Sequence, residues 1–395
     1  MKPSKAILAG TILTPTERIQ NGVILIEGHR ISKVGPREQV KIPAGVPVID
    51  NLDRVVVPGF IDMHIHGAAG HDLMEATPEA VSAVANYLAR HGTTSFLATT
   101  VTASLDRTLH AAKGLGEIIR SSQSSHGASD TIVGAQPVGL HFEGPFLNIK
   151  KRGAHPASQI RNPSTDIAAR FLDAAEGTAR VFTLAPELDG ALAVLEYARS
   201  RGLRVGIGHT NATFEEAERA IAAGATHAVH LYNAMRPFQH RDSGIIGAAL
   251  TDDRICAELI CDGVHVEGPA IRLLAKAKGV ERILLVSDSL SGAGMPDGNY
   301  RLGNFTVHVA GGVCRTVEGN LAGSTVTMDA AVRNLAHYSG LSYAECLRCA
   351  TLNPAKILGL EKQKGVIVPG ADADLAILDQ NYYVTQTYVR GRAVL

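Results

Sequence analysis

The feature that most constrains the fold is a regular alternation of short apolar runs with longer amphipathic stretches through the middle of the chain. Eight apolar runs have strand character, and they end at His66, Thr100, Glu143, Glu187, His209, Tyr232, Asp262 and Asp288. Helical stretches separate most of them, at residues 78–90, 105–119, 167–175, 192–200, 214–222 and 269–276. Alternation of this kind indicates parallel βα units. Since a (β/α)8 barrel typically needs about 250 residues, we predict an α/β protein with a TIM barrel at residues 57–358.

Both ends of the chain instead show short β-like runs separated by Gly, Pro and Asn turns. Each end is too small to bury a core by itself, because small domains expose too much of their surface. We therefore predict one small β-sandwich domain built from both chain termini, residues 1–56 and 359–395. An extra hairpin is expected at residues 299–315, inserted after the eighth barrel strand.

Charge and cysteine content limit the partners and the location of the protein. The formal net charge is +0, which gives no electrostatic reason to expect binding to nucleic acid or to a membrane surface. No run approaches the roughly 20 apolar residues that span a bilayer. The five cysteines include Cys346-x-x-Cys349 without a second pair, so we interpret them as ordinary buried thiols. The first residues lead into a strand-like run rather than a signal-peptide core, and we expect a cytoplasmic protein.

Side chains that can bind a metal occur at the ends of several predicted strands. The first strand ends in His64-Ile65-His66, and Asp62 precedes the first histidine by two residues. Because side chains on a strand alternate between its two faces, these three should lie on one face. The other polar strand ends are Glu143 on the third strand, His209 on the fifth, His230 on the sixth and Asp288 on the eighth. In such barrels the carboxyl ends of the strands meet at one mouth.

Four imidazoles and two carboxylates at one mouth suit Zn²⁺ or Fe²⁺, or a pair of such ions bridged by a carboxylate. A bound ion of this kind acidifies water and polarises a carbonyl group. Asp288 could then take a proton from the attacking water and return it to a leaving amine. A single histidine at a strand end is more often structural, but coincidence on this many strands favours a site. We leave out His227, because a position three residues before His230 faces the other way on a strand. The remaining histidines given structural roles are His71, His91, His110, His126, His240 and His308.

Longer motifs around these residues resemble the amidohydrolase superfamily and, within it, the N-acetylglucosamine-6-phosphate deacetylases. The similarity spans nearly the whole chain. The stretches that carry it are Pro58-Gly59-Phe60-Ile61-Asp62 with the following His-x-His-Gly, Phe142-Glu143-Gly144-Pro145-Phe146, Gly208-His209-Thr210-Asn211-Ala212, His230-Leu231-Tyr232-Asn233-Ala234-Met235, Cys261-Asp262-Gly263-Val264-His265, Val286-Ser287-Asp288 and Gly319-Asn320-Leu321-Ala322-Gly323-Ser324.

The resemblance implies a role for each site residue. Glu143, His209 and His230 would hold one metal ion, while His64 and His66 would complete a second site with Glu143 as the bridge. One or two ions per subunit are therefore expected. Asp288 would be the acid/base, and His155 would help to polarise the acetyl carbonyl. The residues expected around the sugar and its 6-phosphate are His155, Asn233, the backbone of Ala234, Arg241 and His265. In this family the arginine can reach a neighbouring subunit's site, which favours a homodimer.

The resemblance also implies a reaction: metal-dependent hydrolysis of the N-acetyl group of a phosphorylated amino sugar, N-acetylglucosamine 6-phosphate, in amino-sugar catabolism and cell-wall recycling. A different amidohydrolase is one alternative, such as a cyclic-amide hydrolase, an aminoacylase or a deaminase. Many cyclic-amide hydrolases bridge their metals with a carbamylated lysine, whereas here the third strand offers Glu143, and Lys150 and Lys151 lie too far past its end. A catalytically inactive barrel that serves as a binding or scaffold protein is the other alternative, although every expected ligand is present.

Overall fold

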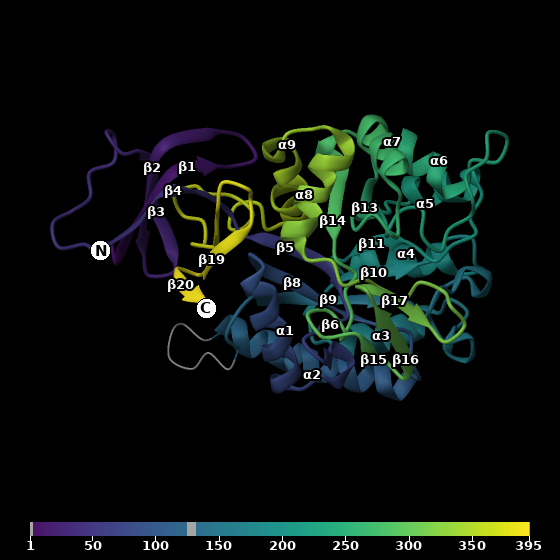
Figure 1. Ribbon diagram of the computed structural model, residues 1–395. Helices are drawn as coiled ribbons and strands as arrows, with labels where there is room; N and C mark the ends of the chain where they lie inside the picture. The colour runs from purple at the N-terminus through teal and green to yellow at the C-terminus, as the bar shows by residue number, and fades with distance from the viewer. Residues whose placement is uncertain (1–2, 125–131, 395) are drawn as a thin grey trace.

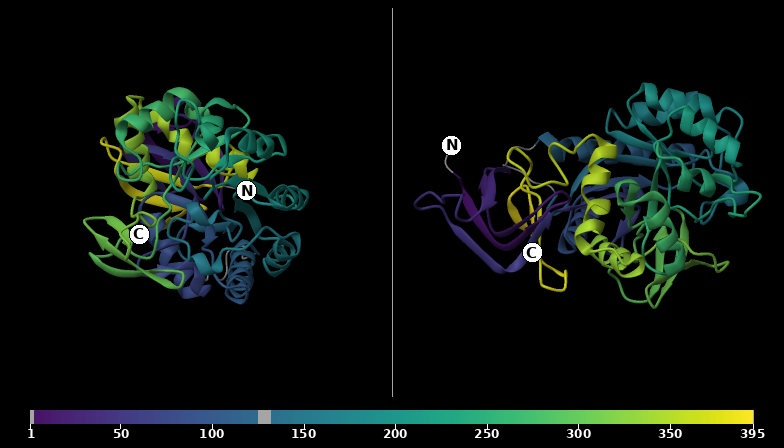
Figure 2. Two further views of the ribbon diagram at one scale, coloured as in Figure 1. Left: turned by 90° about the vertical axis from the view of Figure 1, so that its right-hand side faces the viewer. Right: turned by 90° about the horizontal axis from the view of Figure 1, so that it is seen from above.

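The computed structural model describes residues 3–124 and 132–394. A barrel of parallel strands wrapped by helices forms the larger part of the molecule, and a separate sheet built from both ends of the chain lies beside it (Figure 1). The right-hand view in Figure 2 shows the strands of this terminal sheet at one end of the molecule. Among the described residues, none of the helices is both long and apolar enough to cross a membrane.

Eight strands of the described chain form the barrel sheet, and each pairs in parallel with its neighbour in sequence order. They are β5 (Phe60–Ile65), β8 (Thr93–Thr100), β9 (Gln136–Glu143), β10 (Ala179–Leu184), β11 (Arg204–Ile207), β12 (His227–Ala228), β13 (Cys256–Ile260) and β14 (Ile283–Val286). The helices that follow them in turn are α1 (Pro78–Arg90), α2 (Leu105–Ser124), α3 (Thr165–Ala174), α4 (Ala191–Ser200), α5 (Phe214–Ala222), α6 (Gly244–Thr251), α7 (Gly268–Lys278) and α8 (Met328–Ser339). Two more, α9 (Tyr343–Leu347) and α10 (Leu352–Leu358), complete this region. The predicted (β/α)8 barrel is confirmed.

The first and last strands close the barrel through a few specific bonds. The backbone N–H of Asp288 donates to the carbonyl of His64 at 2.8 Å, and the N–H of His66 donates to the carbonyl of Ser289 at 2.8 Å. The buried carboxylate of Asp62 adds two more bonds, because it accepts the backbone N–H of Ser287 at 3.2 Å and the Ser287 hydroxyl at 2.5 Å. Burial raises the pKa of Asp62 to about 6. Asp62 thus joins strand β5 to the end of β14 rather than contributing a metal ligand.

The terminal sheet draws its strands from both ends of the chain. Within the described ranges seven strands are hydrogen-bonded in the order β20-β19-β18-β4-β1-β2-β3. Their bounds are β1 (Lys5–Leu13), β2 (Arg18–Glu27), β3 (Arg30–Pro36), β4 (Val48–Pro58), β18 (Leu375–Leu378), β19 (Val384–Val389) and β20 (Arg392–Val394). One apolar cluster takes side chains from both ends, including Ile7, Ile24 and Ile377. The predicted assembly from both termini is confirmed, with the strands joined in one continuous sheet and β4 running past residue 56 to Pro58.

A small antiparallel sheet stands where the sequence predicts a hairpin after the eighth barrel strand. It has three strands in the described structure, β15 (Gly298–Leu302), β16 (Phe305–Ala310) and β17 (Val313–Thr316). The carboxylate of Asp72 accepts the N–H of Gly303 at 2.5 Å. Asp72 belongs to the short pair β6 (Gly67–Ala68) and β7 (His71–Asp72) that follows β5. The insert is therefore anchored to the segment next to the His64–His66 motif.

Most barrel strands end earlier than the sequence predicts. The ends at Thr100 and Glu143 are as predicted, but β11 stops at Ile207, β12 at Ala228 and β14 at Val286. The reason is local: His209, His230 and Asp288 have φ values of +48°, +31° and +48°, which no strand can accommodate. These side chains project from turns just past the strands, not from the strands themselves.

Candidate active site

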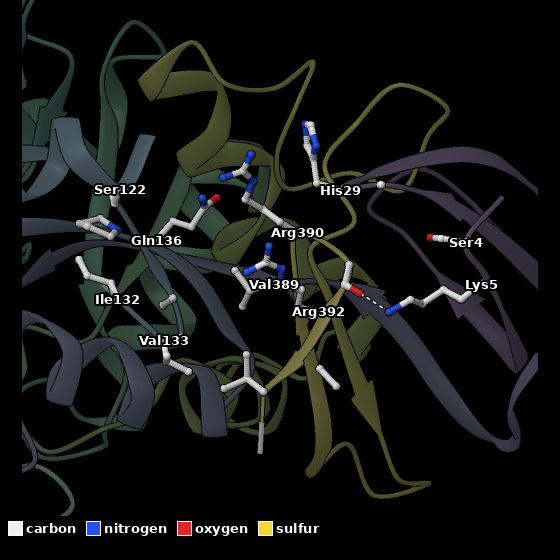
Figure 3. A pocket seen from close by; sticks show the side chains of 17 residues that line it. Ser4, Lys5, His29, Ser122, Ile132, Val133, Gln136, Val389, Arg390 and Arg392 are labelled. Carbon is white, nitrogen blue, oxygen red and sulfur yellow. Dashed lines mark hydrogen bonds between the residues drawn. The ribbon is translucent and has the colours of Figure 1, made fainter. Parts of the chain in front are cut away.

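Two of the cavities in the described structure adjoin the barrel strands at opposite ends. The larger, of about 690 Å³, lies between the terminal sheet and the start of β9 and is lined by residues such as Lys5, Gln136 and Arg390 (Figure 3). In Figure 3 the ammonium of Lys5 donates to the carbonyl of Gly391, at 2.6 Å. This cavity meets the barrel at the amino end of its strands, where features of TIM barrels serve stability rather than catalysis. A second cavity of about 360 Å³ opens at the carboxyl ends and is lined by Glu143 and Asp288, among others. The second cavity is the candidate active site.

Glu143 is the centre of this site. It is the last residue of β9 and is buried. Five imidazole Nε2 atoms surround its carboxylate, with those of His64, His209 and His230 at 3.3, 3.2 and 3.2 Å from Oε1 and those of His66 and His155 at 3.1 and 3.2 Å from Oε2. Although burial opposes ionisation, the charge of His64 and the hydrogen bonds of the other imidazoles hold the pKa of Glu143 well below its usual range. Glu143 is therefore an ionised carboxylate that reaches both halves of the cluster.

Asp288 lies beside the same Nε2 atoms of His64 and His66. Its Oδ1 is 3.3 Å from Nε2 of His66 and 3.7 Å from Nε2 of His64. Burial disfavours its charged form, but the two imidazoles more than compensate and lower its pKa to about 2. Asp288 is thus an ionised carboxylate beside both imidazoles.

For His64, His209 and His155, the hydrogen bond to Nδ1 decides which nitrogen faces the cavity with a lone pair. Nδ1 of His64 is 3.2 Å from the Glu258 carboxylate, and Nδ1 of His209 is 2.9 Å from the carbonyl of Lys151. Both partners only accept, so in the neutral rings that can bind a metal Nδ1 keeps the proton and Nε2 presents its lone pair. His155 is reversed: the backbone N–H of Thr102 donates to its Nδ1 at 3.3 Å. Its Nε2 therefore carries a proton and presents a hydrogen-bond donor.

The donor set fits a divalent metal. Two groups, His64 with His66 and Asp288, and Glu143 with His155 and His209, each place their ligand atoms within 4.8 Å of one another. Because Nε2 of His155 carries a proton, His155 is a hydrogen-bond donor and not a metal ligand. His230 replaces it in the second group, since its Nε2 lies 3.1 Å from Nε2 of His209.

Buried polar atoms without hydrogen-bond partners also indicate a metal site in this cluster. In the described part of the chain, Nε2 of His64 is buried without a hydrogen-bond partner, and buried polar atoms are normally paired. Burial lowers the pKa of His66, but Asp288 and Glu143 outweigh it and raise that pKa to about 9. The cluster thus draws positive charge, and its nitrogen and oxygen ligands suit zinc or iron.

Four of the residues predicted around the substrate line the cavity, and the fifth does not. His155, Asn233, Ala234 and His265 all line the cavity. Nδ1 of His265 is 2.6 Å from Asp262, which lies in the loop after β13. Arg241 is exposed and does not line this cavity of its own chain.

Several residues of the cavity and of its surroundings were not predicted. Lys150 and Arg152 line the cavity and add positive charge there. Glu258 and His141 lie fully buried beneath the ligands. A signal for Glu258 was present, because it is a lone acid within the apolar run of β13. His227, which was excluded from the ligands, lies beside Glu258, with its Nε2 3.3 Å from Oε1. Of the histidines given structural roles, His126 lies outside the described residues, and His71 pairs with Glu75.

Known proteins share both the sequence and the fold. A model of the Amidohydrolase family matches residues 55–394. The chain is 39% identical over 350 residues to N-acetylgalactosamine-6-phosphate deacetylase of Escherichia coli O157:H7, covering 89% of this chain and 90% of that protein. It is 36% identical over 380 residues to N-acetylglucosamine-6-phosphate deacetylase of Bacillus subtilis, covering 96% and 94%.

Solved structures agree with the sequence relatives. A structure of N-acetyl-D-glucosamine-6-phosphate deacetylase from Mycobacterium smegmatis in complex with N-acetyl-D-glucosamine-6-phosphate is 36% identical, covers 99% of each chain and superposes with a TM-score of 0.90. The enzyme from Thermotoga maritima gives a TM-score of 0.86 at 34% identity, with 99% of each chain covered. The chain therefore belongs to the amidohydrolase family and, within it, to the group of the N-acetylglucosamine-6-phosphate deacetylases.

Proposed function

We propose that this enzyme hydrolyses the acetamide of N-acetylglucosamine 6-phosphate to glucosamine 6-phosphate and acetate, in amino-sugar catabolism and cell-wall recycling. The observation that carries the proposal is the set of groups around Glu143. Imidazoles present Nε2 lone pairs there, and the N–H of His155 and the carboxylate of Asp288 lie beside them. Metal ligands, an oxyanion donor and a proton acceptor are what amide hydrolysis requires. Relatives with this printed activity cover nearly the whole chain.

The metal would be held by Glu143, His209 and His230, with His64 and His66 available for a second ion. A divalent ion there, Zn²⁺ or Fe²⁺, supplies a Lewis acid that polarises the carbonyl and acidifies a water molecule. Whether one or two ions bind can be counted by metal analysis of the purified protein.

The chain's own residues carry the proton and the developing charge. Nε2–H of His155 donates to the acetyl oxygen as that oxygen becomes negative. Asp288 accepts a proton from the attacking water on its carboxylate and then gives it to the sugar nitrogen, so that the C–N bond breaks as an amine leaves. The low pKa of Asp288 ensures that it starts ionised at neutral pH.

The sugar and phosphate would be bound by His265, Asn233 and the backbone of Ala234. Lys150 and Arg152 add cations at the same cavity, and arginine suits a phosphate because it is always charged and can bind two oxygens. Since Arg241 is exposed and outside its own cavity, we propose that it serves the partner's site in a homodimer. Five free cysteines are in keeping with the reducing cytoplasm as the location.

Similarity to one relative suggests a second candidate substrate. The E. coli O157:H7 relative at 39% identity is named for N-acetylgalactosamine 6-phosphate. The same reaction on that sugar differs only in the configuration at carbon 4. Measuring kcat/KM on both phosphorylated sugars decides between them.

Acetate release by the metal-replete enzyme is the direct test. We expect turnover of the phosphorylated sugar and a much lower kcat/KM for unphosphorylated N-acetylglucosamine. Asp288→Asn should lose about 10²- to 10⁴-fold in kcat, because the proton acceptor is gone. Full activity in this variant, or no acetate from the metal-replete wild type, would contradict the proposal.

A further inference from the structure

Glu258 is a buried carboxylate that the proposed chemistry does not use. It lies in the middle of β13 (Cys256–Ile260) with 0% of its surface exposed, between the buried Ala257 and Leu259. Interiors of TIM barrels are usually filled by branched apolar side chains. A charge in such a place is costly unless it is paired and hydrogen-bonded, so its contacts should explain why it is there.

The contacts of Glu258 all lead to the metal cluster or to the layer beneath it. Its Oε2 is 3.2 Å from Nδ1 of His64 and accepts the backbone N–H of His230, also at 3.2 Å. Its Oε1 is 3.3 Å from Nε2 of His227, which makes no hydrogen bond there among the described residues. Two metal ligands therefore share one oxygen atom of Glu258.

We propose that Glu258 is a positioning residue for the His64 half of the metal site: by accepting the Nδ1 proton of His64, it turns the Nε2 lone pair of that ring toward Glu143 and Asp288. An ionised carboxylate can only accept, so it selects one tautomer and one ring orientation. His66 has no such support, because its Nδ1 is buried without a partner in the described part of the chain. Of the two imidazoles in this half, only His64 has its Nδ1 fixed by a hydrogen bond in that part.

A matched pair of substitutions separates this role from simple packing. Glu258→Gln keeps an oxygen for His64 and His230 and can direct its amide NH₂ toward Nε2 of His227. Glu258→Leu fills similar space without an acceptor. The inference rests on the metal dependence of the proposed function, so metal binding rather than turnover is the readout.

Metal-free full-length protein would be titrated with Zn²⁺ against a chromophoric chelator, after thermal unfolding has shown that each variant is folded. We expect Glu258→Leu to weaken one binding event by about 10- to 100-fold and Glu258→Gln to stay close to wild type. The same loss should follow from His64→Asn. In that background Glu258→Leu should cost nothing further, because the two residues act on one ion.

Three results would overturn the inference. These are unchanged Zn²⁺ affinity in a folded Glu258→Leu protein, equal weakening of every binding event, and a loss that persists in the His64→Asn background. The last would show that Glu258 acts through the backbone of His230. A wild-type protein that binds no Zn²⁺ at all overturns the proposed function as well, so the two failures are distinguishable.

Discussion

Three residues of the active site share an unusual backbone. His209, His230 and Asp288 all lie in the left-handed region, which costs a residue other than glycine of the order of 1–3 kcal/mol. Hydrogen bonds hold each of them: Asp288 donates to the carbonyl of His64, His230 donates to Glu258, and the carbonyl of His209 accepts the N–H of Asn148. The strain turns the chain sharply after each strand, so that the side chains aim at the same point.

His155 gives a prediction about the transition state. Replacing it by glutamine should lower kcat about 10²- to 10³-fold, because one donor to the developing oxyanion loses its position. KM should change much less, since the ground-state carbonyl gains less from that donor. Steady-state kinetics would measure both. His71→Gln is the control, because His71 pairs with Glu75 outside the cavity; equal losses in the two variants would contradict the role of His155.

The features of the site that could not be predicted from the sequence depend on contacts between residues far apart in the chain. The strand-end ligands could be predicted, because strand ends meet at one barrel mouth whatever the loops do. The tautomer of His155 could not, because it depends on the backbone N–H of Thr102. A lone acid in an apolar strand marked Glu258 as unusual, but its role could not be predicted because it depends on the ring of His64, which lies against it.

Among the elements, the join between β5 and β14 bears most directly on the site. Asp62 and Ser287 link these strands immediately below His64 and Asp288. Strand β5 carries both Asp62 and His64, and the turn after β14 carries both Ser287 and Asp288. Barrel closure therefore also sets the spacing of His64 and Asp288.

Ser287→Ala tests this join. The hydroxyl is a donor to a fully buried carboxylate, and leaving that oxygen unpaired should lower the free energy of unfolding by about 1–3 kcal/mol. Urea denaturation followed by circular dichroism would measure it. Ser200→Ala is the comparison, since the Ser200 hydroxyl bonds only within its own exposed helix turn. We expect a change there within about 0.5 kcal/mol; similar losses at both positions would count against a special role for the join.

The helices and strands were predictable where local sequence decides them. The helices Pro78–Arg90 and Phe214–Ala222 are those the sequence predicts, because each begins after a threonine that caps it. The insert was predicted as a hairpin, yet it holds three strands, since strands as short as β17 (Val313–Thr316) leave little periodicity to read.

At the scale of the whole molecule, a buried ion cluster ties the terminal sheet to the barrel. The ammonium of Lys364 lies 2.7 Å from Asp374 and 2.9 Å from Asp372, and it donates to the side chain of Gln136 at the start of β9. Burial would lower the pKa of Lys364, but the two carboxylates outweigh it and raise that pKa above the ordinary value of 10.5.

Lys364→Met should lower the free energy of unfolding by about 3–5 kcal/mol, because it leaves the buried carboxylate of Asp374 and the partly buried one of Asp372 without their cation. The pH dependence has a definite sign. A raised pKa in the folded state contributes stability that is complete below pH 10.5 and is lost as the pH rises through the higher folded value. Denaturation of both proteins from pH 8 upward should show their difference shrinking only in the alkaline range. A difference that is constant with pH would contradict this assignment.

The order of the terminal sheet has a consequence for how the protein is made. Strand β4 lies between β1 and β18, so one of its edges is filled only by a strand from the far end of the chain. During synthesis the ribosome must deliver the entire barrel before that partner emerges. Until then the growing chain carries an open strand edge of the kind that other chains can join. A message or a chain cut short anywhere after the barrel would therefore yield a protein with all of its predicted catalytic side chains and an unfinished sheet, a natural target for the cell's chaperones and proteases.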